Sequence, residues 1–393
     1  MPSTQALTGL RVLDLTRLLP GPLATLHLAD LGADVIKIED VGAGDYARTM
    51  GPSGGGGNDD SLFFRLINRN KKSLRLDLKQ PEGVAVFLRL AKDADMIFES
   101  FRPGVVDKLG IGYETVRAIN PRIVYCAITG YGQTGPWAQR AGHDINYIAT
   151  AGLLDQTGAA DGPPAIANLQ TGDILGGALT SLLGALAAVI GAKNSGQGSH
   201  VDISMTDSVF AHTLFPFMIA SAFGSRPAPR GDDLLTGRVP CYGVYRTADD
   251  RYLAVGALEP KFWQALCAVI DRPDLAPWGL ATGSKGRETK AELAALIATQ
   301  PLAHWEAVFA EHDCCVTAVL HSGEAIRHPQ LQARNMIVDV DGMQQLAPPL
   351  RLSSWPWPEP HPAPACGADS EAILSAAGYS LEEIATMRRN KVI

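Results

Sequence analysis

Residues 10–39 read LRVLDLTRLLPGPLATLHLADLGADVIKIE: an apolar run, a longer stretch with helical spacing, and a second β-branched run. The two runs, 10–15 and 33–39, are short and rich in Val, Ile and Leu, which favours buried strands. A helix between two strands is the building unit of a parallel sheet, because parallel strands need a crossover connection. This stretch therefore predicts an open α/β sheet.

The same alternation continues beyond this stretch. Further strands are predicted at 73–78, 94–100, 122–128 and 199–205. The first strand-to-helix turn lacks the G-x-G-x-x-G spacing that lets a backbone approach a pyrophosphate, and the glycine-rich segment 51–61 lacks the following Lys-Ser or Lys-Thr of a phosphate-binding loop. We therefore expect a Rossmann-like open parallel sheet that does not bind a nicotinamide or flavin, with 51–61 as a surface loop.

A different kind of domain begins near residue 225, after a segment rich in proline and charge. Two strands around an Ala-Asp-Asp turn are expected in 242–258, followed by three helices and a segment too proline-dense for regular structure. These elements are expected at 260–270, 288–298, 301–311 and 346–365. Ser380 and Glu383 predict a capping box at the start of a last helix. We expect a large α/β domain (1–224 and 332–393) and a smaller α+β domain (225–331).

Composition excludes several classes of function. The chain has 393 residues and a net charge of −7, with 41 acidic residues against 34 Lys and Arg, which argues against a protein that coats nucleic acid or a membrane surface. The six cysteines lack the spacing of a disulfide framework or a zinc site, and the N-terminus does not resemble a signal peptide. We expect a cytoplasmic protein with no metal and no cofactor of its own.

One segment, Ile174–Ala192, is uncharged and about long enough to cross a bilayer. Gly, Ala, Ser and Thr stand beside its leucines, which is typical of a close-packed buried helix. We expect no membrane insertion.

The stretch AGHDINY (141–147) raises the question of what His143 does. Taken alone, it would be a core or capping histidine. Asp173, thirty residues later, stands where the long apolar helix begins, and taken alone it would be an N-cap whose oxygen accepts backbone N–H bonds.

Ten motifs, in order and at these distances, resemble the family III CoA-transferase and racemase superfamily. They are GLRVLDLT, PGP, LADLGADVIKIE, NRNKKS, FRPG, LGIGYE, ITGYGQTGP, AGHDINY, TGDILGG and GALEPKF. The resemblance extends from Leu7 to the proline-rich tail and is strongest to the α-methylacyl-CoA racemases. It implies an interlocked homodimer that acts on acyl-CoA, with each active site between one subunit's large domain and the other's small domain.

The resemblance to racemases rests on His143, because family transferases usually carry another residue, often aromatic, at this position. It implies that His143 and Asp173 are the catalytic pair. It also implies that the backbone N–H of Asp144 binds the thioester oxygen, that Glu259 bonds to the histidine, and that Tyr147 belongs to the site.

The chemistry explains why two groups are needed. Inverting the carbon next to a thioester carbonyl requires that a proton leave one face and another arrive on the opposite face, which a single base cannot do. With His143 and Asp173 on opposite faces, the two groups share one proton in each working form, so their pKa values belong to the pair.

CoA carries phosphates, so a local cluster of cations is expected. NRNKKS supplies Arg69, Lys71 and Lys72, and FRPG supplies Arg102 after a strand end. Asp40 departs from the family, because this position can carry an arginine that contacts CoA.

Two other functions stay open at this point. A CoA-transferase would use Asp173 as a nucleophile and form an acyl-aspartyl anhydride. A non-enzymatic acyl-CoA-binding scaffold would have no need of the pair formed by His143 and Asp173.

Overall fold

The computed structural model describes residues 5–53, 60–223 and 230–393, so the tetraglycine of the predicted 51–61 loop lies outside the described residues. The chain divides into two compact units. Unit 1 comprises Met1–Gly152, Asn168–Thr213 and Ala333–Ile393, and unit 2 comprises Leu153–Ala167 and Leu214–Gln332. The domain boundaries expected from the sequence stay a prediction.

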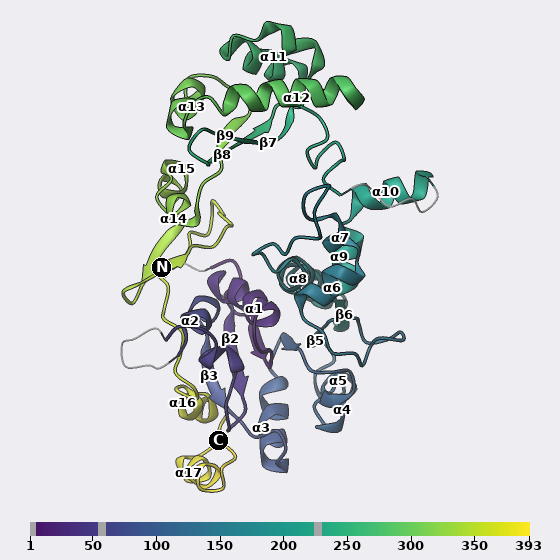
Figure 1. Cartoon of the computed structure of the whole chain (residues 1–393). Coiled ribbons are helices and arrows are strands. Elements are labelled where there is room, and N and C mark those ends of the chain that lie inside the picture. Colours follow the sequence, from purple (N-terminus) through teal and green to yellow (C-terminus); the bar gives the residue numbers. More distant parts are fainter. Residues whose placement is uncertain (1–4, 54–59, 224–229) are drawn as a thin grey trace. The chain divides into compact units, whose positions relative to one another are not determined.

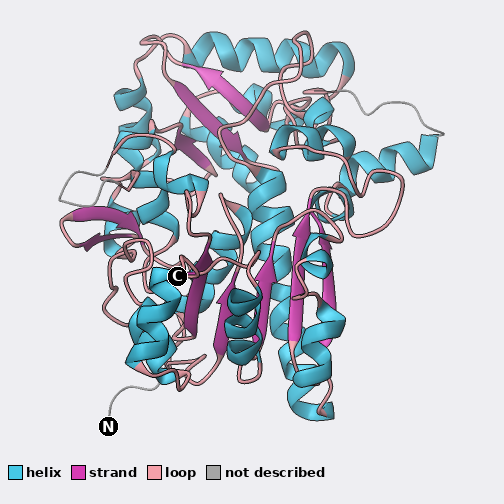
Figure 2. Ribbon diagram, turned by 90° about the horizontal axis from the view of Figure 1, so that it is seen from below, coloured by secondary structure: helices cyan, strands magenta, loops and turns pink. Residues whose placement is uncertain are grey.

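Unit 1 is built on a six-stranded parallel sheet, which confirms the predicted α/β class (Figures 1 and 2). The strands are β1 (Arg11–Asp14), β2 (Asp34–Glu39), β3 (Lys72–Arg75), β4 (Met96–Glu99), β5 (Val124–Thr129) and β6 (Ser199–Ser204). Their order is β3-β2-β1-β4-β5-β6. The order reverses between β1 and β4, and ligands of such sheets bind outside the carboxyl ends of the strands at this point.

Helices cover both faces of this sheet, because alternate strand residues point to opposite sides. Val12 packs into one buried cluster and Leu13 into the other. The Val12 side is covered by α1 (Pro20–Asp30), α6 (Asp144–Thr150), η2 (Gly172–Leu179), α8 (Thr180–Ser195) and α9 (Met205–Ala211). The Leu13 side is covered by α3 (Pro81–Ala91), α4 (Val105–Lys108), α5 (Tyr113–Ile119), α16 (Ser370–Ala376) and α17 (Leu381–Arg389).

The remaining elements of unit 1 lie outside these layers. They are η1 (Tyr46–Thr49), α2 (Leu62–Ile67) and a hairpin of β10 (Ile337–Val340) and β11 (Met343–Leu346). The capping box is confirmed: Ser380 accepts the N–H of Glu383, whose side chain accepts the N–H of Ser380. The β10–β11 hairpin and α16 were not predicted.

Unit 2 carries an antiparallel sheet in the order β7-β8-β9. Its strands are β7 (Tyr242–Arg246), β8 (Tyr252–Gly256) and β9 (Val316–Ala318). Its helices are α7 (Leu153–Gln156), α10 (Leu214–Phe223), α11 (Pro260–Val269), η3 (Pro273–Trp278), α12 (Gly283–Ile297), α13 (Leu302–Phe309), α14 (Ser322–Ala325) and α15 (Pro329–Ala333). The predicted hairpin and its three helices are confirmed, while β9 was not predicted because it is only three residues long.

A buried network of charges joins β1, β2 and the segment before β3. Asp14 is fully buried, and one of its oxygens lies 3.1 Å from Nζ of Lys71. The Thr25 hydroxyl donates to the same carboxylate at 2.6 Å. Burial acts to raise the pKa of Asp14, but Lys71 and Lys37 outweigh it, so the pKa is lowered to about 2.

The long apolar helix predicted near 174–192 spans Gly172–Ser195 and has the length and composition of a membrane span. One face is buried in unit 1 through Ala185 and Val189, whereas Leu183 and Ile190 on the other are 72% and 62% exposed. The prediction of a buried helix is therefore confirmed for one face and wrong for the other. The absence of membrane insertion stays a prediction.

Replacing Lys71 should lower the free energy of unfolding far more than replacing its neighbour Lys72. Lys71→Ala leaves the buried Asp14 with one cation fewer, which we expect to cost about 3–5 kcal/mol of unfolding free energy. Lys72 is half exposed and pairs with Asp34 at the surface, so Lys72→Ala is the matched control and should cost less than about 1 kcal/mol. Urea unfolding at one protein concentration measures both; equal midpoints would contradict the expected role of the network.

Candidate active site

A cavity of about 250 Å³ lies at the carboxyl ends of β1, β4 and β5 in unit 1. The loop after β1 contributes Arg17, the loop after β4 contributes 100–103, and the end of β5 contributes Thr129 and Gly130. The cavity thus spans the point where the strand order reverses, which is where ligands of this sheet type bind.

The structure brings His143 and Asp173 together in this cavity. His143 is the exposed residue that precedes α6, and its backbone N–H donates to Oδ1 of Asn146 at 3.0 Å. Asp173 is half-buried in the first turn of η2, which is a π-helix. Such wide turns occur often at functional sites.

Asp173 is not the N-cap that its sequence position suggested. Thr171 holds that position, and no side-chain cap hydrogen bond is made there. Instead, the backbone N–H of Asp173 donates to Oδ1 of Asp144 at 3.0 Å. Asp173 lines the cavity, and no side-chain cap hydrogen bond is made at the start of η2.

Tyr147 supports the same corner of the cavity. Its buried side chain donates through the hydroxyl to the carbonyl of Gly142 at 2.5 Å, and its ring packs edge-on against Tyr131. A Cβ at Gly130 or Gly142 would lie 2.3 or 2.7 Å from this ring, so glycine is required at both positions. Tyr147 thereby fixes the backbone just before His143.

The electrostatics of the cavity favour a protonated carboxyl group. Burial, and next to it the negative charge of Asp144, raise the pKa of Asp173 to about 7. Burial also raises the pKa of the Tyr147 hydroxyl, which stays neutral. At neutral pH, Asp173 can therefore both give and accept a proton.

Three guanidinium groups line the same cavity: Arg17, Arg102 and Arg140. Only Arg102 was singled out from the sequence. Arg17 forms an ion pair with Asp40 at 2.9 Å, and Arg140 lies over the ring of Trp137 at 4.2 Å. Sequence position could have indicated both, because Arg17 closely follows a strand end and Arg140 comes three residues before His143.

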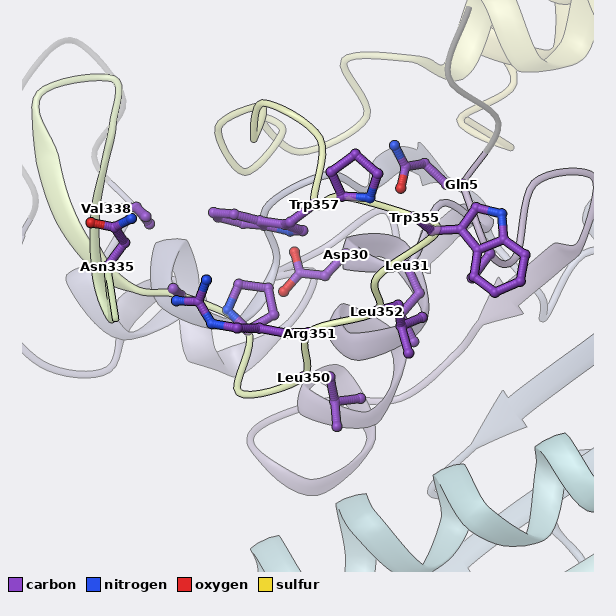
Figure 3. A pocket seen from close by; sticks show the side chains of 14 residues that line it. Gln5, Asp30, Leu31, Asn335, Val338, Leu350, Arg351, Leu352, Trp355 and Trp357 are labelled. Carbon is purple, nitrogen blue, oxygen red and sulfur yellow. The ribbon is translucent and has the colours of Figure 1, made fainter. Parts of the chain in front are cut away.

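Arg69, predicted to bind CoA, pairs instead with Asp30, which lines a second cavity of about 390 Å³. This cavity is lined by Asp30, Trp355 and Trp357, which Figure 3 labels. Arg69 is 3% exposed, pairs with Asp30 at 2.6 Å and lies 5.4 Å from the centre of the Trp357 ring. Its charge is thus already neutralised inside the fold, which disfavours a role in binding phosphate.

The two predicted lysines also lie away from the first cavity. Lys71 is buried with Asp14, and burial lowers its pKa to about 8. Lys72 pairs with Asp34 at the opposite, amino-terminal edge of the sheet. The binding role predicted for both stays a prediction that their placement does not favour.

Glu259 belongs to unit 2, where it is exposed and precedes α11. Its predicted hydrogen bond to the histidine stays a prediction. Within the described ranges, no group of three or more His, Cys, Asp and Glu side chains could hold a metal ion.

A buried acid, Glu99, lies at the end of β4 behind the loop that carries Arg102. It is 3% exposed and accepts the N–H of Phe101 at 2.7 Å. Burial raises its pKa to about 8, and Asp107 adds to this rise. No local pattern singled out Glu99, because its burial depends on the neighbouring strands.

Known proteins resemble the chain over nearly its whole length. Residues 7–370 match the model of CoA-transferase family III. An acetyl-CoA:oxalate CoA-transferase of Acetobacter aceti is 37% identical, covering 88% of this chain and 89% of the relative. An alpha-methylacyl-CoA racemase of Homo sapiens is 34% identical, covering 99% and 97%. A CAIB/BAIF family protein from Brucella suis matches in structure with a TM-score of 0.85 and 30% identity, covering 95% of this chain and 100% of that one.

Removing the ionisable group of Glu99 should stabilise the protein at alkaline pH. The folded chain keeps this proton up to about pH 8, whereas the unfolded chain loses it near 4.5, so the carboxyl group makes stability fall as pH rises between these values. Glu99→Gln retains an acceptor for Phe101 and should gain on the order of 1–3 kcal/mol over wild type at pH 8 but little at pH 4.5. Urea unfolding of wild type and variant between pH 4.5 and pH 8 measures this gain in unfolding free energy. Glu114→Gln, at an exposed position, is the control, and an equal gain at both pH values would contradict the burial argument.

Proposed function

Since this chain belongs to CoA-transferase family III, we propose that it is an isomerase that inverts the C2 stereocentre of 2-methylacyl-CoA thioesters. The observation that carries the proposal is the placement of His143 and Asp173 in one cavity, with the pKa of Asp173 raised to about 7. A neutral imidazole and a protonated carboxyl group are the two forms that proton exchange at neutral pH needs.

In the proposed step, neutral His143 removes the C2 proton from one face, and the electron pair of the broken C–H bond moves into an enolate. The Asp173 carboxyl group then delivers its proton to C2 on the opposite face, and the thioester is restored. The enzyme is left with an imidazolium and a carboxylate, which is the form that runs the reaction in the other direction. Tyr147 holds the backbone before His143 throughout.

The enolate needs a hydrogen-bond donor at the thioester oxygen, and we assign this to the backbone N–H of Asp144 on the strength of the family resemblance. The cations that line the cavity suit the phosphates of CoA, which supports Arg102 as a binding residue and adds Arg17 and Arg140. Glu259 keeps its proposed role as a hydrogen-bond partner of the histidine. No cofactor besides the CoA of the substrate enters the proposed reaction.

The second candidate is CoA transfer, favoured by the 37% identity to an acetyl-CoA:oxalate CoA-transferase. In that reaction the Asp173 carboxylate would attack the thioester carbonyl, with CoA thiolate leaving and an acyl anhydride forming. A nucleophile must be ionised, and a pKa near 7 leaves much of the carboxyl protonated. The raised pKa of Asp173 therefore favours proton transfer over CoA transfer.

We also propose that the protein is a homodimer in the cytoplasm. Exposed apolar side chains support an interface: Leu183 and Ile190 on α8, and Leu214, Phe215 and Met218 on α10. Isolated soluble chains rarely expose a group of large apolar side chains such as the three on α10. The free state of all six cysteines fits a reducing compartment.

Solvent exchange tests the proposed reaction. In heavy water, 2-methylacyl-CoA incubated with the protein should gain deuterium at C2 without any acceptor acid, because enolisation needs only the thioester. Mass spectrometry and chiral analysis of the recovered acid measure label and inversion. Absence of label from both epimers at several chain lengths, with ready transfer of CoA to an added carboxylic acid, would replace this function by CoA transfer.

Variants of the pair separate the two roles of Asp173. Asp173→Asn keeps the shape but removes the acid, so epimerisation should fall by about 10²- to 10⁴-fold. Exchange should then be kept mainly for the S epimer, assigned to the histidine face by family resemblance, and His143→Ala should show the opposite preference. Hydroxylamine should trap no acyl-Asp173. A trapped adduct during turnover, with His143→Ala close to wild type, would contradict the two-base mechanism.

A further inference from the structure

The side chain of Asp144 is in direct contact with the chain segment that carries Asp173. Its Oδ1 accepts the backbone N–H of Asp173 at 3.0 Å, although the two residues are 29 positions apart. The first residue of α6 is thereby joined to the first turn of η2. This bond fixes the backbone position of Asp173, and with it the point on η2 from which the side chain extends.

The approach is close because of a glycine. Gly172 is buried, and a Cβ there would lie 3.0 Å from Oδ1 of Asp144 and 3.4 Å from Cβ of Tyr147. A larger residue would push α6 away from η2, and Asp144 would lose its contact with the N–H of Asp173. The small residue therefore keeps two carboxyl groups near each other.

We propose that the carboxylate of Asp144 is a positioning residue that fixes Asp173 in the cavity and keeps it in the protonated form that donates to C2. This role belongs to the side chain, whereas the proposed contact with the thioester oxygen belongs to the backbone N–H. The inference rests on the proposed two-base function and deepens it.

Charge explains how one carboxylate controls the other. A negative group close to a second carboxyl disfavours ionisation of the second, and Asp144 is the neighbouring charge that raises the pKa of Asp173 beyond the effect of burial. The N–H bond keeps Asp144 at this short range. A neutral amide at the same position would accept the N–H bond but exert no such repulsion.

The other groups around Asp173 differ from Asp144 in charge or exposure. The cavity contains His143, Tyr147 and the guanidinium groups of Arg17, Arg102 and Arg140. On the other elements that pack against η2, the ionisable side chains are exposed to solvent: Asp207 of α9, Lys193 of α8, and His200 and Asp202 of β6. The helix α1, which also packs against η2, carries no ionisable residue before His27. None of these groups combines a negative charge with a hydrogen bond to the Asp173 backbone, as Asp144 does.

Two substitutions separate charge from shape. Asp144→Asn keeps an acceptor oxygen for the N–H of Asp173 and removes the charge, whereas Asp144→Ala removes both. Asp249 provides a matched control in unit 2, because its Oδ1 accepts the backbone N–H of Leu302, the first residue of α13, at 3.1 Å. Asp249→Asn should therefore leave Asp173 unchanged.

The primary measurement is the titration of the Asp173 carboxyl carbon by NMR in the full chain labelled with [4-¹³C]aspartate, assigned by its loss in Asp173→Asn. We expect a wild-type midpoint near 7, and in Asp144→Asn a midpoint lower by roughly 0.5 to 1 in pH, since a repelling charge is gone. The bell-shaped pH profile of deuterium exchange should move toward acid by a similar amount. Exchange at pH 8 should fall by about 3- to 10-fold.

An unchanged Asp173 midpoint in Asp144→Asn would overturn the proposal, as would an equal change in Asp249→Asn. If the midpoint moves but neither wild type nor variant exchanges deuterium, the proton-transfer function fails, while the electrostatic control of Asp173 stands. If Asp144→Ala lowers exchange but Asp144→Asn matches wild type in midpoint and pH profile, Asp144 serves shape alone and the proposed role is wrong.

Discussion

The buried carboxylate of Asp14 holds together the segments around the carboxyl-terminal end of β1, where the site is built. It accepts hydrogen bonds from Thr16 in the loop between β1 and α1 and from Thr25 in α1, and it pairs with Lys71 from the segment before β3. The ammonium of Lys37 donates to the carbonyl of Thr16 at 2.9 Å. These contacts hold the loop between β1 and α1 in one conformation. The same loop carries Arg17, which lines the cavity.

Such a network is stable only when complete. Removing a group from it leaves a charge or a polar atom buried without compensation, which costs more than the intact contact contributes. The loop also requires Gly21, since a Cβ there would lie 2.2 Å from Cβ of Thr16. Sterics and electrostatics thus select one loop conformation together, with Leu18 in the left-handed region at φ 65°.

Buried surroundings change the pKa values of Asp14 and Asp173 in opposite directions. Asp14 is buried among cations and its pKa falls, whereas Asp173 is partly buried beside another carboxylate and its pKa rises to about 7. The same residue type is therefore ionised and structural at the end of β1, whereas Asp173 can exchange a proton near neutral pH. Neighbouring charge decides between the two outcomes, because burial by itself raises the pKa of both groups.

The sequence by itself determined the parallel sheet, the hairpin of the second unit and the capping box, because hydrophobic period and turn chemistry act over short stretches. His143, Tyr147 and Asp173 were singled out by the family resemblance of their motifs, and the structure places all three at one cavity. Only the tertiary structure decided which cations line the cavity. NRNKKS is typical of a basic surface cluster, yet Arg69 and Lys71 are buried. Their ion partners are Asp30 of α1 and Asp14 of β1, which lie 39 and 57 positions away in the sequence. Charge pairing across such distances follows from how strands are ordered in the sheet, which local pattern does not encode.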